Sequence, residues 1–581
     1  MKNSHASLSL VSHTERGEVS LQFPVLPLPR RRLLTALILT ISLGNSVSVA
    51  GSAAAETAAS LLARTKVLSS DEFEGRGPGT PGEEKTVSYL EAEFRKLGLK
   101  PGNPNGTYIQ DAPLVGITSI PTLAFDVGGR PLPMEHINDF VGFSTRVTSR
   151  VEAKDTDVVF VGYGVVAPEY GWDDYKGVDV RGKTVVMLIN DPPVPGADGQ
   201  LDPKVFGGKA MTYYGRWTYK YEIAAQKGAA ACLIVHETAP AAYPFGVVVS
   251  SWTRENFEIR SPDNNAGHIA LSGWLTLDAA KKLIAAGGND FDALKKAAVT
   301  REFRPVPLGA MASFTVTNTL RNVASRNVIA LLPGTDAKRR NEYVIYNAHW
   351  DHLGRDPRLK GDQIYNGAAD NAAGTAVLLE IAQAMKALPA AQQPKRSVLF
   401  LSVTAEEKGL LGSRFYAQNP LYPLTQSVAV INMDGANQFG RTSDMEVIGF
   451  GASTIDDIGL AVASEQGREM HPDSHPERGS YYRSDHFEFA KVGVPAYYTK
   501  AGRKFIGQPD DYADKKVNEY IAKDYHQPSD EVKPDWTFEG AAQDTEFLVQ
   551  VGLRIANGTE WPAWKPGNEF KARRDAMMKP R

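Results

Sequence analysis

Histidine and carboxylate residues stand where three strongly apolar segments of this sequence end. They are, in chain order, His349 and Asp351 after residues 343–348, Glu406 and Glu407 after residues 397–404, and Asp434 after residues 427–433. Charge placed beside an apolar core is costly unless something compensates it. A divalent metal ion is the simplest compensation, and zinc accepts imidazole and carboxylate ligands together.

Two further clusters carry residues of the same chemical types. Asp370 is surrounded by Gly and Ala residues just before an apolar stretch, and Tyr525 and His526 lie in a polar segment near the end of the chain. Taken singly, such residues also have structural explanations. Asp370 can act as a helix N-cap, and Glu406 with Glu407 can be a solvated pair at the positive end of a helix. The coincidence of all the clusters is what favours a metal site.

The segments that precede these residues must position them. Residues 343–348, 397–404 and 427–433 predict three buried strands, and apolar residues at helical intervals predict a helix over 372–388. Strands and helices alternate from about residue 324 onward, which is typical of an α/β fold with a mixed, mostly parallel central sheet flanked by helices. Ligands of such sheets bind beyond the carboxyl ends of the strands. We therefore expect the three strand-end clusters to meet at one edge.

These motifs, in this order and spacing, resemble those of the dizinc aminopeptidases in the zinc exopeptidase superfamily. The matching segments are 348–354, 370–374, 404–413, 432–434 and 525–526, with further likeness at 484–487 and 492–496. Two other segments resemble parts of longer members. Residues 71–82, a Gly- and Pro-rich loop, are similar to the N-terminal segment of bacterial members, and residues 158–191 are similar to the inserted protease-associated domain.

The resemblance implies a role for each candidate residue. It implies two zinc ions per chain, one held by His349, Asp370 and Asp434, the other by Asp370, Glu407 and His526. It further implies that Glu406 is the general base, that Asp351 accepts the free N–H of the His349 imidazole, and that Tyr525 stabilises the oxyanion. The expected activity is removal of N-terminal residues from peptide substrates.

Three other functions compete with this interpretation. A carboxypeptidase or dipeptidase on the same metal pair would need a cation for the substrate carboxylate, for which Arg483 and Lys500 are the candidates, although either can simply face solvent. A glutaminyl cyclase-like acyltransferase would use a single zinc, which the full set of expected ligands disfavours. A non-enzymatic receptor on this scaffold typically loses ligands, and this chain keeps them.

Composition excludes other classes of function. The 581 residues include 64 Lys and Arg against 67 Asp and Glu, so the balance gives no electrostatic reason to expect a nucleic acid or an anionic membrane as partner. Cys232 is the only cysteine, which excludes intramolecular disulfides and thiolate zinc clusters. Its apolar surroundings predict a buried, inert thiol. Any metal must therefore be held by His, Asp and Glu.

The N-terminal region has the pattern of an export signal. Arg30, Arg31 and Arg32 precede an apolar run over 33–43 and an Ala-rich exit at 53–55. The run is shorter than the roughly 20 residues that span a bilayer, and no later run is apolar enough, so no membrane span is expected in the mature chain. An uncleaved anchor or a buried helix is the alternative. We expect a periplasmic or extracellular protein.

Changes along the chain in the pattern of apolar runs and of Gly- and Pro-rich turns predict the domains. They are a signal peptide and extension over 1–55, an N-terminal part of the peptidase domain over 56–138, an inserted, mostly β protease-associated domain over 139–305, the zinc peptidase catalytic domain over 306–567, and a tail over 568–581.

Overall fold

The structure is a computed structural model that describes residues 54–579. The expected signal peptide lies almost entirely outside the described residues. Among the described helices, none combines the length and the apolar character needed to cross a bilayer.

The main sheet places the three predicted strands side by side. Its order is β19, β18, β20, β17, β13, β16 and β12. The strands are β13 (Tyr343–His349), β16 (Ser397–Val403), β17 (Ser427–Asn432), β18 (Asp444–Ile448), β19 (Glu469–Pro472), β20 (Ala496–Ala501) and β12 (Val306–Leu332). β13 runs parallel to both β16 and β17, whereas the β12–β16 and β18–β20 pairs are antiparallel. The mixed, mostly parallel sheet flanked by helices is confirmed.

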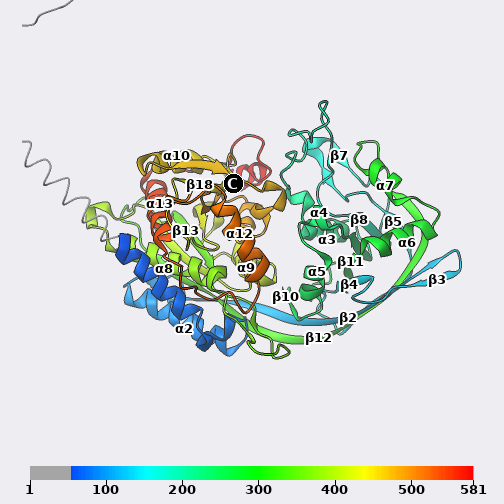
Figure 1. The fold of residues 1–581 in the computed structure, drawn as a ribbon, viewed down its shortest axis with the longest axis horizontal. Helices are drawn as coiled ribbons and strands as arrows, with labels where there is room; N and C mark the ends of the chain where they lie inside the picture. The colour runs from blue at the N-terminus through cyan, green and yellow to red at the C-terminus, as the bar shows by residue number, and fades with distance from the viewer. Residues whose placement is uncertain (1–53, 580–581) are drawn as a thin grey trace, which may run out of the picture. The chain divides into compact units, whose positions relative to one another are not determined.

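Alternate side chains of each central strand enter different hydrophobic cores. In β13, Val344 and Tyr346 pack with helices α8 (Ala373–Ala387) and α13 (Glu539–Asn557), while Ile345 packs on the opposite face. That face is covered by α9 (Leu411–Gln418) and α11 (His486–Lys491). Because both faces are covered, the strands are continuous apolar runs rather than alternating ones. α8 and α13 lie beside the sheet in Figure 1.

The N-terminal region is more regular than expected. A helix over 54–68 is followed by a 3₁₀ turn at Asp71–Arg76 and by helix α2 (Pro81–Lys96). Residues 71–82, which their glycines and prolines predict to be a loop without regular structure, instead contain a 3₁₀ turn at one end and the start of α2 at the other, so that prediction is wrong at both ends. Pro81 occupies the first turn of α2, where a missing N–H costs nothing, and positive φ at Glu74, Gly75 and Arg76 lets the chain reverse before it.

A long antiparallel ribbon leaves the main sheet. β2 (Ile109–Val127) pairs with β12 without interruption from Ile109 opposite Val328 to Val127 opposite Ala310. At one end β12 pairs with β16, and at the other it pairs with β5 (Arg150–Phe160). One hydrogen-bonded sheet therefore extends through both the main part and the inserted part, as β2 and β12 show in Figure 1.

The inserted part has its own parallel strands and its own core. β5, β8 (Thr184–Leu188), β9 (Ala231–Val235) and β11 (Leu271–Leu275) follow one another, with β4 (Phe140–Phe143) antiparallel at the edge. The core includes Leu123 and Phe125 of β2, which lie outside the bounds of 139–305 expected from the sequence. Cys232 is buried in β9, as predicted.

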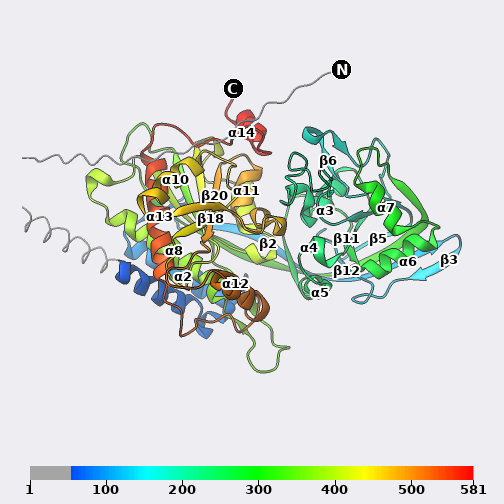
Figure 2. The ribbon, with the colours of Figure 1, turned by 45° about the horizontal axis from the view of Figure 1, so that its top comes forward.

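Helices contribute as much to this part as strands do. The prediction of a mostly β module did not include these helices. They are α3 (Trp217–Gln226), α4 (Thr238–Ala241), α5 (Phe245–Trp252), α6 (Leu277–Ala286) and α7 (Phe291–Ala298). Two of them carry readable start signals. The Thr276 side chain accepts the backbone N–H of Ala279, and the Asp290 side chain accepts that of Ala293. Both act as N-caps. α6 and α7 are neighbours in Figure 2.

Short elements complete the chain. They are β1 (Lys100–Pro101), β3 (Arg130–Pro133), β6 (Val166–Ala167), β7 (Trp172–Asp173), β10 (Asn256–Ile259), β14 (Gly354–Arg355), β15 (Ile364–Tyr365), α10 (Ile455–Glu465), α12 (Tyr512–Lys523) and α14 (Lys571–Met577).

Candidate metal centre

Parallel strands bring the predicted residues to one edge of the main sheet. His349 is the last residue of β13, Glu406 opens a 3₁₀ turn three residues beyond β16, and Asp434 follows β17 by two residues. Asp370 lies at the kinked entry to α8, where its backbone angles and those of Asn371 are not helical. His526 comes from the segment after α12.

One group of side chains surrounds the Nε2 atom of His349. Asp370 Oδ1 lies 3.4 Å from this nitrogen and Asp434 Oδ1 lies 3.5 Å from it. The nitrogen is buried and has no hydrogen-bond partner among the described residues. A buried nitrogen without a partner needs an explanation, and a cation held between it and the two carboxylates would supply one.

A second group shares Asp370. His526 Nε2 lies 3.3 Å from Asp370 Oδ2 and 3.1 Å from Glu407 Oε2. Asp370 therefore turns one carboxylate oxygen towards each histidine. The side chain of His526 is 34% exposed and that of Asp434 is 22% exposed, whereas His349 is buried. The cluster is thus partly exposed at His526 and Asp434 and buried at His349.

The spacing of these atoms suits zinc. With zinc–nitrogen and zinc–oxygen bonds of about 2.0–2.2 Å and tetrahedral angles, two ligand atoms lie roughly 3.3–3.6 Å apart. Three of the four separations, 3.3, 3.4 and 3.5 Å, lie within this range, and the fourth, 3.1 Å between His526 and Glu407, is slightly shorter. The donors, imidazole and carboxylate without thiolate, also suit zinc.

His352 is a neighbour of the cluster to which the sequence analysis gave no role. Its Nδ1 lies 2.6 Å from Glu407 Oε1, and it forms a second possible metal-holding group with Asp370 and Glu407. A separation of 2.6 Å is shorter than two ligands of one zinc allow but suits a hydrogen bond. We interpret His352 as a donor that orients Glu407. The sequence did offer one indication of a role for His352, because it lies three residues after His349, beyond the end of a predicted strand.

Asp351 is buried beside His349 but does not make the expected contact. Its carboxylate lies 3.7 Å from His349 Nδ1, too far for a hydrogen bond, while its backbone carbonyl lies 3.2 Å from the same nitrogen. The carboxylate instead accepts the backbone N–H of Glu406 at 3.0 Å. Asp351 therefore links the loop after β13 to the turn that carries Glu406.

Glu406 lies within reach of the cluster without joining either group. Its Oε2 is 4.0 Å from His349 Nε2. Burial raises the pKa of Glu406 well above its usual range; His349 opposes this shift, and the charges of Asp434 and Glu407 reinforce it. For His349 burial favours the neutral ring, but Glu406 and the neighbouring carboxylates outweigh burial and hold its pKa well above its usual value. This excess of negative charge is what a divalent cation would neutralise.

Asn371 and Asp530 hold the backbone around Asp370. The Asn371 amide donates to the carbonyls of His349 and Met433 at 3.3 and 3.1 Å and accepts the N–H of Gly435 at 2.8 Å. The Asp530 carboxylate accepts the N–H groups of Ala369 and Asp370 at 3.0 and 3.2 Å. The backbone at Asp370 is therefore fixed by hydrogen bonds from several directions.

Tyr525 lies at the rim of the cluster. Its ring stacks on that of His526 with centroids 3.9 Å apart. Burial raises the pKa of its hydroxyl, with His526 and Arg483 opposing that shift, so it is a protonated donor at neutral pH. Lys500 Nζ lies 5.7 Å from the centroid of the Tyr498 ring, and the Tyr498 hydroxyl donates to the carbonyl of Asp434 at 3.2 Å.

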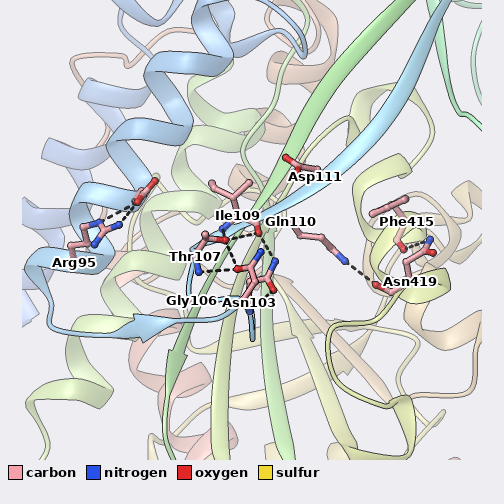
Figure 3. A pocket seen from close by; sticks show the side chains of 11 residues that line it. Arg95, Asn103, Gly106, Thr107, Ile109, Gln110, Asp111, Phe415 and Asn419 are labelled. Atoms are coloured by element: carbon pink, nitrogen blue, oxygen red, sulfur yellow. Dashed lines mark hydrogen bonds and ion pairs between the residues drawn. The ribbon is translucent and has the colours of Figure 1, made fainter.

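A surface hollow between the N-terminal segment and α9 is unrelated to this cluster. Figure 3 shows Asn103, Thr107, Gln110 and Asn419 around it. None of the predicted metal ligands lines it.

Comparison with known proteins agrees with the resemblance seen in the sequence. Residues 327–549 match the profile of peptidase family M28. Aminopeptidase NAALADL1 of Mus musculus is 36% identical over 131 residues, 22% of this chain and 16% of the relative. Aminopeptidase YwaD of Bacillus subtilis (strain 168) is 33% identical over 98 residues, 17% of this chain and 18% of the relative. The chain thus matches less than a fifth of the length of either relative.

Solved structures align over more of the chain. The aminopeptidase from Aneurinibacillus sp. strain AM-1 aligns over 88% of this chain and 95% of its own, with 20% identity and a TM-score of 0.45. BSAP, a zinc aminopeptidase from Bacillus subtilis, aligns over 88% of this chain and 97% of its own, with 17% identity and a TM-score of 0.39.

Proposed function

We propose that this chain, which carries a peptidase family M28 domain over residues 327–549, is an exported dizinc aminopeptidase. Its substrates would be peptides with a free amino terminus. The observation that carries the proposal is the pair of histidines, His349 and His526, each facing a different oxygen of Asp370. A carboxylate shared in this way suits two metal ions better than one.

The ligand assignment follows from the two groups. His349, Asp370 and Asp434 would hold one zinc, and Asp370, Glu407 and His526 the other. Two zinc ions so held would lower the pKa of a bound water from about 15.7 towards about 7 and polarise the scissile carbonyl.

The chain's own residues would move the protons. Glu406, close to both groups but in neither, would accept the proton of the attacking water and pass it to the leaving amine. The Tyr525 hydroxyl would donate a hydrogen bond to the carbonyl oxygen as negative charge develops there. Asp351 would keep Glu406 in position through the backbone N–H of that residue.

Digestion of matched peptides tests the proposal. A peptide with a free amino terminus should lose its first residue, and the same peptide N-acetylated should be resistant, as read by mass spectrometry of the products. Equal cleavage of both would contradict an aminopeptidase.

The carboxypeptidase or dipeptidase alternative has one observation in its favour. Burial acts to lower the pKa of Arg483, named from the sequence as a possible carboxylate partner, but the charges of Tyr525, Tyr243 and Glu406 outweigh burial and raise it. Removal of C-terminal residues, abolished by C-terminal amidation of the peptide, would support that alternative instead.

Export is the part of the proposal that depends on the sequence alone. Its test is the N-terminal residue of the protein recovered outside the cytoplasm. A chain that begins near residue 55 supports cleavage of the predicted signal peptide, and retention of residues 30–43 contradicts it.

A further inference from the structure

Arg76 is a cation in the interior of the protein. Only 1% of it is exposed. It makes no salt bridge within 4 Å to any carboxylate of the described residues 54–579, although burial of a charge without a direct partner is costly. Burial lowers its pKa to about 10, while the more distant charges of Asp530, Asp351 and Asp370 raise it, so it remains charged at neutral pH.

The guanidinium donates to four backbone carbonyls instead. Nε donates to the carbonyl of Trp350 at 2.9 Å, and Nη2 donates to that of Gly367 at 2.8 Å. Nη1 donates to the carbonyls of Leu68 at 2.7 Å and Asn366 at 2.6 Å. A planar fork with five donors can make these contacts at once, which a lysine ammonium cannot.

Three of these carbonyls belong to the two loops that carry the proposed metal ligands, and the fourth, that of Leu68, is at the end of the helix over 54–68. Trp350 lies between His349 and Asp351, and Gly367 lies three residues before Asp370. The backbone is bound as well, because the carbonyl of Arg76 accepts the N–H of His352 at 3.3 Å. Arg76 thus connects the two loops without touching a ligand side chain.

The segment that carries Arg76 is closely seated against the same region. Gly75 has φ of 68°, and a Cβ there would lie 2.4 Å from the carbonyl oxygen of Gly354 and 2.6 Å from that of Tyr365. The Asn366 amide donates back to the carbonyl of Ser69 at 2.8 Å and to Asp71 at 2.9 Å. The contact is therefore specific and made from both sides.

We infer that Arg76 is a positioning residue for the metal centre: it sets the separation of His349 from Asp370 by holding the carbonyls of Trp350 and Gly367. The segment over residues 71–82 then helps to position the proposed metal ligands. This inference rests on the metal ligands named under the proposed function.

Metal affinity tests the inference without any need for activity. Arg76→Gln and the milder Arg76→Lys are compared with the wild type by zinc content after dialysis against a chelator and by the visible spectrum of the Co²⁺-substituted protein. We expect the zinc dissociation constant to rise about 10–100-fold, the range typical of lost partners behind metal ligands, together with a changed Co²⁺ spectrum. Arg76→Lys should lie between the wild type and Arg76→Gln.

Arg396 provides a matched control. It too is fully buried and donates to backbone carbonyls, those of Ile555, Gly558 and Thr559. Unlike Arg76 it also pairs with a carboxylate, that of Glu342, and none of these partners belongs to the metal centre. Arg396→Lys should lower the unfolding temperature yet leave zinc affinity and the Co²⁺ spectrum unchanged.

The outcomes separate the two hypotheses. Folded Arg76 variants that bind zinc like the wild type would overturn the inference, as would Arg76→Lys and Arg396→Lys that lower zinc affinity equally. Should Arg76→Gln fail to fold, the comparison of the two Lys variants decides. A wild-type protein that binds no metal would instead overturn the proposed function.

Discussion

Asp370 and Glu406 occupy distinct positions in one buried cluster, and the difference lies in what each oxygen faces. Both oxygens of Asp370 face histidine nitrogens at 3.3–3.4 Å, as a shared ligand requires. Glu406 approaches His349 only to 4.0 Å. A carboxylate near the ligands but outside their spacing is free to carry a proton.

Substitution of Glu406 should separate chemistry from metal binding. Glu406→Gln keeps the shape and removes the base, so we expect kcat to fall about 10²–10⁴-fold while elemental analysis finds unchanged zinc. Glu407→Ala is the control: it should lose one metal per chain. Near-wild-type turnover of Glu406→Gln would contradict the assigned base.

The sequence predicted the types of residues in the cluster better than their mutual contacts. His349, Asp370, Glu407, Asp434 and His526 are brought together as their positions after strands and in loops suggested. The role of His352 was missed because its link to Glu407 is a side-chain contact between loops that no local pattern encodes. The contact that Asp351 makes with Glu406 was missed for the same reason.

Among the elements, α8 depends on a glycine in its first turn. A Cβ on Gly374 would lie 2.0 Å from Asn371 Oδ1. The Asn371 amide cannot move away cheaply, because three hydrogen bonds hold it.

Gly374→Ala should therefore disturb the entry to α8. We expect a loss of about 1–3 kcal/mol in unfolding free energy, as for other overpacked sites, together with weaker zinc binding, measured by denaturant unfolding and dialysis. Gly267→Ala, where a Cβ would meet nothing within 4 Å, is the control. Equal behaviour of the two variants would argue against this account.

The first turn of α10 contains a buried carboxyl with a shifted titration. Burial raises the pKa of Asp456 from 3.8 to about 6, although the N–H of Gly451 donates to it at 2.9 Å. Below pH 3.8 the group is neutral in both folded and unfolded chains. Between pH 3.8 and about 6 the unfolded chain has lost this proton while the folded chain still holds it. The free energy of unfolding therefore falls as the pH rises through that range.

Asp456→Asn should remove this loss. Relative to wild type, the variant should gain up to about 3 kcal/mol between pH 4 and pH 7, since one pKa unit is about 1.4 kcal/mol. Urea unfolding of both proteins across that range measures the difference. A difference that stays constant with pH would show that Asp456 does not titrate as described.

Elements with strong local patterns were predictable, and those set by distant contacts were not. β13, β16, β17 and α8 follow from apolar runs and helical spacing. The 3₁₀ turn at Asp71–Arg76 does not, because its positive φ angles are stabilised by contacts with Gly354 and Asn366, far along the chain. The uninterrupted pairing of β2 with β12 likewise depends on partners about 200 residues apart.

At the scale of the whole molecule, that ribbon decides where the chain can be divided. Deletion of residues 139–305, the bounds expected from the sequence, would remove β5 and leave core residues such as Phe125 and Phe314 without cover. Deletion of residues 118–319 instead cuts the ribbon where Ile117 faces Leu320. An Asn-Gly turn suits that pair as a two-residue hairpin loop.

We expect the 118–319 deletion joined by Asn-Gly to be soluble, folded and able to bind zinc, and the 139–305 deletion to aggregate. Size-exclusion chromatography, circular dichroism and zinc content check this. A soluble, folded 139–305 deletion would mean that β2 and β12 do not need β5 and the inserted core to cover Phe125 and Phe314.

The same ribbon constrains how such an insert can be exchanged between relatives. A graft has to join two strands at once, and an error of a single residue on either one would reverse the inward and outward faces of everything beyond the junction. Recombination is then tolerated only at matched pairs of positions, so we expect such an insert to be exchanged together with the strands that carry it.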